Sequence, residues 1–171
     1  MLIPSMISSP DGFRPSSFST KIGKTHMTND RLELYMETSC GVVLVNLGTV
    51  LLLQYPQGHW DLPKGHIEDT DLDNFETAKR ELSEETGIMD FEFVDGFEFR
   101  TQYEFKHKGK LRSKQVFWYL ATTEKISISL SKEHRDYMWL DWPQAIELVT
   151  HDETKGVITT AHDFMKEIGL D

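Results

Sequence analysis

The sequence is poor in cysteine, in long apolar stretches and in positive charge. Its 171 residues include one cysteine, Cys40, which excludes an internal disulfide framework and a zinc site built from cysteines. The longest apolar runs, 41–45 and 50–53, are far shorter than the roughly 18 residues of a membrane-spanning helix. The 18 Lys and Arg residues are outnumbered by 28 Asp and Glu, and the net charge of −10 disfavours binding to long nucleic acids.

The rest of the composition is that of a globular domain. Hydrophobic residues make up 39% of the chain and aromatic residues 11%, enough to form a buried core. Residues 1–35 contain three of the six prolines and six serines, so we expect a flexible N-terminal tail followed by one domain over 36–171. A targeting sequence is the less favoured alternative for the tail, because it lacks an Arg-rich amphipathic pattern and a secretory hydrophobic region. We expect a monomer in a reducing, cytoplasmic setting.

The side-chain pattern predicts a mixture of strands and helices. One amphipathic helix has Asp73 or Asn74 as its N-cap and ends at Gly87. This mixture favours an α/β fold, an α/β/α sandwich in which helices cover both faces of a mixed central sheet. The predicted strands are 38–45, 49–55, 91–101, 115–122 and 137–140, and the other predicted helices are 142–150 and 153–168.

Three carboxylates gather on one face of the first predicted helix. Glu81, Glu84 and Glu85 stand at positions i, i+3 and i+4, where like charges repel. One interpretation is a solvated acidic surface. The other is a site for a hard divalent cation, since Mg²⁺ and Mn²⁺ select carboxylate oxygens. The preceding glycine-containing loop lies close enough in the sequence for the Gly65 carbonyl to complete such a site.

The residues around these carboxylates resemble the Nudix hydrolases. The motif of that family is glycine, five residues, glutamate, seven residues, and then Arg-Glu-aliphatic-x-Glu-Glu-x-Gly-aliphatic. Residues 80–88, Arg-Glu-Leu-Ser-Glu-Glu-Thr-Gly-Ile, match the second half at every fixed position. In the first half, five residues separate Gly65 from Asp71, which replaces the glutamate, and eight rather than seven residues separate Asp71 from Arg80. We expect the loop to bulge by one residue, with little effect on the metal site.

The resemblance extends over about 36–165 and is most specific for one subfamily. Segments 58–68, 75–78, 117–121 and 130–140 are similar to the asymmetric bis(5′-nucleosyl)-tetraphosphatases of animals and archaea. The resemblance implies hydrolysis of diadenosine tetraphosphate to ATP and AMP. It also implies a small-molecule nucleotide substrate, with neither long nucleic acid nor membrane as a partner.

The resemblance assigns residues to a metal site and to catalysis. It implies that Mg²⁺, or Mn²⁺, is bound by the Gly65 carbonyl and by Glu81, Glu84, Glu85 and Glu133. Arg80 would orient a carboxylate through a charge-assisted pair. One carboxylate would accept the proton of the attacking water, and we favour Glu81 over Glu133. The alternative for Glu133 is an exposed loop acid without a role.

Substrate-binding residues are expected around the motif. His59 and Lys64 could hold phosphate oxygens. By resemblance Tyr103 would stack on a base, with His151 near the opposite aromatic position. Five cations without an intervening acid could clamp the polyphosphate, with Lys114 the best candidate, or could be a solvated hairpin tip. This basic strip comprises Lys106, Lys108, Lys110, Arg112 and Lys114.

Two alternative functions remain open from the sequence. The first is a pyrophosphohydrolase for nucleoside triphosphates, diphosphoinositol polyphosphates or RNA 5′ ends. The second, from a different class, is a catalytically silent Nudix domain that binds a nucleotide. The three retained motif glutamates favour an enzyme over the silent domain.

Overall fold

The computed structural model describes residues 35–171, so the expected N-terminal tail lies, apart from Tyr35, outside the described residues. An eight-stranded mixed sheet forms the centre of the fold, and three helices pack around it. The strands are β1 (Tyr35–Asn46), β2 (Thr49–Gln54), β3 (Trp60–Asp61), β4 (Lys64–His66), β5 (Glu92–Phe93), β6 (Phe99–His107), β7 (Lys110–Thr122) and β8 (Asp136–Asp141). The helices are α1 (Asn74–Thr86), α2 (Trp142–Leu148) and α3 (Asp152–Glu167).

The long strand β1 organises the sheet. It runs parallel to β7 over its whole length, from Tyr35 opposite Arg112 to Val45 opposite Thr122. Its other edge pairs with β2 near the C-terminal end of β1 and with β4 at its middle, both antiparallel. Strand β4, which carries Lys64 and Gly65, is thereby fixed beside the middle of β1.

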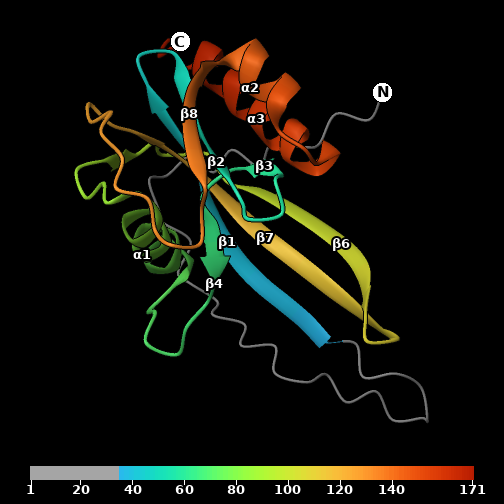
Figure 1. Cartoon of the computed structure of the whole chain (residues 1–171). Helices are drawn as coiled ribbons and strands as arrows, with labels where there is room; N and C mark the ends of the chain where they lie inside the picture. Colours follow the sequence, from blue (N-terminus) through green and yellow to red (C-terminus); the bar gives the residue numbers. More distant parts are fainter. Residues whose placement is uncertain (1–34) are drawn as a thin grey trace.

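Apolar side chains alternate along β1 and β7 and form a core on each face of the sheet. One core contains Val43, Val116 and Trp118 together with residues of α2 and α3. The other contains Cys40, Tyr119 and residues of α1, such as Leu82. Figure 1 shows α1 on one side of the sheet and α2 and α3 on the other. The predicted mixed sheet with helices on both faces is therefore confirmed.

Helix α1 has the predicted ends. The Asp73 side chain accepts a hydrogen bond from the Glu76 backbone N–H, and Gly87 adopts a left-handed conformation with a φ of 72°. None of the helices within 35–171 is both long and apolar enough to span a bilayer.

Two parts of the sheet differ from the sequence prediction. The strand predicted over 91–101 is broken into β5 and β6, because a turn at Asp95 and Gly96, with a φ of 89° at Gly96, interrupts it. Strands β3 and β4 were not predicted, since they are only two and three residues long within a segment rich in turn-forming residues.

Candidate active site

The acidic face of α1 lies against the segment that contains Gly65. Glu85 is 3% exposed, whereas the Glu84 side chain is 58% exposed. The carboxylate of Glu81 packs so closely on Gly65 that a Cβ atom at Gly65 would overlap it. A glycine is therefore required if Glu81 is to keep this position.

Arg80 contacts carboxylates both on the acidic face and in the loop before α1. Its Nε and Nη2 donate to the two carboxylate oxygens of Asp71 at 3.0 and 2.9 Å. Its Nη1 contacts Glu81 at 2.8 Å and Glu84 at 3.2 Å. The paired guanidinium lowers the pKa of Asp71 to about 2. Asp71 thus holds Arg80, and Arg80 holds two of the motif carboxylates.

Glu85 is the most buried of the three motif glutamates. The Lys64 backbone N–H donates to its Oε2 at 3.0 Å, and Nε2 of the fully buried His134 side chain lies 3.7 Å from its Oε1. Burial, followed by the charge of Glu81, raises the pKa of Glu85 to about 9, and burial also raises the pKa of Glu81. Burial and the neighbouring acids therefore disfavour the charged form of Glu85.

A second segment faces the same carboxylates. The backbone N–H groups of Ser129 and Ser131 donate to carbonyls at the end of α1, at 2.8 and 3.2 Å. These bonds bring the following Glu133 close to the helix. After the larger effect of burial, the Glu133 charge contributes to raising the pKa values of Glu81 and Glu85. Glu133 therefore approaches the acidic face from outside the Nudix-like motif.

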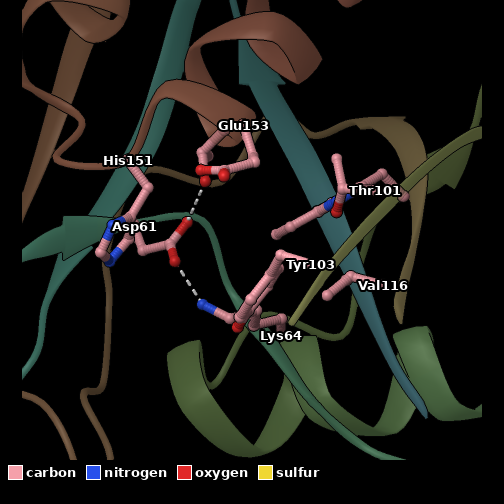
Figure 2. A pocket seen from close by; sticks show the side chains of 9 residues that line it. Asp61, Lys64, Thr101, Tyr103, Val116, His151 and Glu153 are labelled. Atoms are coloured by element: carbon pink, nitrogen blue, oxygen red, sulfur yellow. Dashed lines mark hydrogen bonds and ion pairs between the residues drawn. The ribbon is translucent and has the colours of Figure 1, made fainter. Parts of the chain in front are cut away.

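A cavity of about 150 Å³ lies on the α3 side of the sheet. Its floor is formed by buried residues of β6 and β7, and charged and aromatic side chains surround its mouth (Figure 2). The lining residues are Asp61, Lys64, Thr101, Tyr103, Val116, Trp118, His151, Glu153 and Thr154.

Lys64 joins the acidic face to the cavity. Its backbone N–H reaches Glu85 on α1, whereas its ammonium group pairs with the Asp61 carboxylate in the cavity. Asp61 is buried and also accepts from the Leu62 backbone N–H at 2.8 Å and the Thr154 hydroxyl at 3.1 Å. Asp61 consequently ties Lys64 to the first turn of α3.

Tyr103 and Lys114 are brought together beside this lysine. They are directly paired across β6 and β7, so their side chains share one face of the sheet. Burial, followed by the charge of Lys64, lowers the pKa of Lys114. His151 also lines the cavity. His59 does not: its ring lies 5.5 Å from that of His151 and stacks on another aromatic residue, Tyr55, at 4.7 Å.

The residues of the basic strip lie on two faces and in the turn of the β6–β7 hairpin. Strand β6 ends at His107 and β7 begins at Lys110, so Lys108 lies in the exposed turn. Lys114, Arg112 and Lys110 alternate along the face that carries Tyr103. Lys106 points to the opposite face, and Arg112 pairs with Glu37 at 3.4 Å.

Comparison with known proteins agrees with this arrangement. A family model described as "NUDIX domain" matches residues 36–161. The chain belongs to the Nudix family. The rat asymmetrical bis(5′-nucleosyl)-tetraphosphatase is 36% identical over 121 residues, which are 67% of this chain and 79% of the rat protein.

Two solved structures show the same fold. A C. elegans Ap4A hydrolase binary complex superimposes with a TM-score of 0.62 at 24% identity, covering 77% of this chain and 98% of that one. The E. coli dihydroneopterin triphosphate pyrophosphohydrolase gives a TM-score of 0.58 at 20% identity, covering 74% and 96%. Both structures therefore share the fold of this chain at low sequence identity.

Several residues of this Nudix site were not found from the sequence. Asp71 was given no part in the site, although it is the main partner of Arg80. Asp61 and Glu153 were not considered, because strand β3 and the start of α3 meet only in the fold. The position of Asp61 three residues before Lys64 was the one available signal.

Proposed function

We propose that this Nudix protein hydrolyses dinucleoside tetraphosphates, diadenosine tetraphosphate among them, to ATP and AMP, with Mg²⁺ or Mn²⁺ as cofactor. The observation that supports this most directly is Lys64, which contacts Glu85 on one side and on the other lines a cavity that also contains the aromatic side chains of Tyr103 and His151. A substrate with a base at one end and a long phosphate chain needs such a connection. The similarity to the rat enzyme supports the same substrate class.

The donors at the acidic face suit a hard divalent cation. Glu81, Glu84, Glu85 and the Gly65 carbonyl supply only oxygen, with Glu133 approaching from the neighbouring segment. Within 35–171, no three His, Cys, Asp or Glu side chains are arranged to hold a metal ion; here Arg80 and the Lys64 N–H donate to these carboxylates instead. A bound cation would supply charge neutralisation at the phosphate oxygens and would acidify a water. The raised pKa values of Glu81 and Glu85 are those of carboxylates that need such a charge.

The remaining residues position the substrate and move one proton. Glu81 accepts the proton of the attacking water, and Arg80 holds Glu81 in place. Lys64, which lines the cavity, and Lys114, which is paired with the cavity residue Tyr103 on the same sheet face, attract the phosphate chain. Tyr103 and His151 stack on the base, and His59 supports the His151 ring.

The deciding experiment is incubation with diadenosine tetraphosphate in ¹⁸O-labelled water, with and without Mg²⁺. We expect ATP and AMP in equal amounts, Mg²⁺-dependent, with the label in AMP. Preferred hydrolysis of nucleoside triphosphates, diphosphoinositol polyphosphates or triphosphorylated RNA would contradict the proposed substrate. Binding without hydrolysis would indicate the catalytically silent domain.

A matched pair of variants tests the carboxylate face. Glu84→Gln is expected to lower kcat at least roughly a hundredfold while the protein remains folded, because it weakens a ligand of the catalytic cation. Glu167→Gln, at the exposed end of α3, serves as the control and keeps the wild-type rate. A near-wild-type rate for Glu84→Gln would rule out this role for the acidic face.

A further inference from the structure

The cavity has two chemically different ends. Figure 2 shows Lys64 and Glu153 on opposite sides of Asp61, with Tyr103 beside Lys64. Lys64 marks the end that adjoins the acidic face, because its backbone contacts Glu85. Glu153 lies in the first turn of α3 and marks the end that is remote from the acidic face.

The Glu153 carboxylate is free to receive a ligand. Its side chain is exposed at the cavity mouth, and within the described part of the chain it makes no hydrogen bond or ion pair. Asp61, the other cavity carboxylate, is instead occupied by Lys64, by Thr154 and by its own loop. Glu153 is therefore the carboxylate that can contact a base without breaking an existing bond.

The orientation of a bound nucleotide follows from its phosphates. If the phosphate chain extends from the Lys64 end toward the acidic face, the sugar lies on that side of the base as well. The Watson–Crick edge of a purine is on the opposite side from its glycosidic bond. This edge is therefore directed toward Glu153.

We propose that Glu153 is a specificity-determining residue that selects guanine over adenine by accepting two hydrogen bonds from the Watson–Crick edge. The proposal rests on the proposed function, because it needs phosphates at the Lys64 end. Guanine presents two adjacent donors, N1–H and N2–H₂, which match the two oxygens of a carboxylate. Adenine presents one donor, N6–H₂, beside the N1 lone pair, which a second carboxylate oxygen repels.

The cavity floor suits the remaining edge of either purine. The Thr101 hydroxyl oxygen accepts from the Trp118 indole N–H at 3.0 Å, so the Thr101 hydrogen is available to a ring nitrogen or carbonyl. This donor serves N7 of both bases and does not distinguish them. Discrimination between the two purines is accordingly assigned to Glu153.

The test measures mononucleotide binding, which does not require catalysis. Isothermal titration of the full chain with GMP and AMP is expected to show GMP binding roughly tenfold more tightly, as a bidentate base contact would give. In Glu153→Gln the ratio of GMP affinity to AMP affinity is expected to fall at least fivefold, because an amide pairs well with adenine. The control is Asp152→Asn, which removes an adjacent charge that does not line the cavity; it keeps the wild-type ratio.

The outcomes separate this inference from the proposed function. Equal affinities for GMP and AMP, no binding of either, or a ratio that Glu153→Gln leaves unchanged would overturn the role of Glu153. The protein could show the expected ratios of GMP to AMP affinity and yet hydrolyse neither diguanosine nor diadenosine tetraphosphate. This outcome would support the role of Glu153 and refute the proposed reaction. If the role of Glu153 and the proposed reaction are both correct, kcat/KM for diguanosine tetraphosphate exceeds kcat/KM for diadenosine tetraphosphate. Glu153→Gln then reduces the difference between these two kcat/KM values.

Discussion

Asp71 shows how a single side chain stabilises the active-site loop. It accepts two bonds from Arg80 and one from the Thr77 hydroxyl, and its own side chain is 6% exposed. An aspartate and a longer loop take the place of the family glutamate here. The shorter side chain still reaches Arg80 across this longer loop. Asp71 is thus a structural partner of Arg80.

Asp71→Asn is expected to lower the free energy of unfolding by about 2 kcal/mol at pH 7, from the depression of the Asp71 pKa from 3.8 to about 2. Because the pKa is lower in the folded protein, this stabilisation is present above the unfolded pKa and disappears as the pH falls to 2. Urea unfolding, followed by tryptophan fluorescence, measures the difference between wild type and variant across this range. Asp163→Asn on the exposed face of α3 is the control. A difference that stays constant down to pH 2 would contradict the assignment.

Gly65 can be tested separately from stability. In Gly65→Ala the new Cβ displaces the Glu81 carboxylate, which is the flexible end of a side chain, so the fold is expected to lose less than about 1 kcal/mol. Hydrolysis is expected to fall at least roughly tenfold, because the displaced carboxylate is the proposed base. The control is Gly156→Ala within α3, where a Cβ meets nothing; it is expected to stabilise by about 0.5–1 kcal/mol with unchanged activity. Full activity of Gly65→Ala would show that this close contact is dispensable.

The residues that could be predicted are those that belong to contiguous motifs. The helical spacing of Glu81, Glu84 and Glu85 predicted that they share one helix face, and the resemblance to the Nudix motif predicted their metal role; in the structure the carboxylate of Glu81 lies against Gly65. Glu153 could not be found in this way, because its significance depends on a cavity between β6 and α3. A site built from several elements appears in the sequence only where one element carries several of its residues.

At the scale of elements, prediction succeeded where the local signals agreed. The β1–β2 hairpin and α1 have both an apolar pattern and a defined turn or cap, so their positions follow from the sequence. Strand β4 has no such pattern: its three residues are a strand because β1 offers them an unpaired edge. This tertiary pairing, which fixes Lys64 and Gly65, could not be read from local residues.

The alternation of side chains along the β6–β7 hairpin makes a prediction for the basic strip. Lys114→Met is expected to raise KM for diadenosine tetraphosphate roughly tenfold with little change in kcat, as loss of a charged contact to the phosphates requires. Lys106→Met is expected to change KM less than about twofold, because Lys106 is exposed and points away from Tyr103. Steady-state kinetics of both variants test this. Equal effects would assign the strip a general electrostatic role rather than a specific contact.

At the scale of the whole molecule, the sheet separates the acidic face from the cavity. The acidic face belongs to α1 on one side, and the cavity belongs to α3 on the other. Lys64 contacts both regions, because its backbone N–H donates to Glu85 and its ammonium group pairs with Asp61. The net charge of −10 therefore does not exclude a phosphate substrate, because in the proposed metal site some of the acids would hold cations rather than meet phosphate directly.

This arrangement predicts that divalent cations stabilise the whole fold. Because Glu81 and Glu85 are desolvated in the folded protein and solvated when unfolded, a cation that binds the acidic face favours the folded state. We expect Mg²⁺ at ten times its Kd to raise the free energy of unfolding by about 1.4 kcal/mol. Urea unfolding in MgCl₂, compared with NaCl at equal ionic strength, measures the effect. Glu84→Gln should lose most of the gain and Glu167→Gln should retain it; an equal gain in NaCl would show charge screening instead of a specific site.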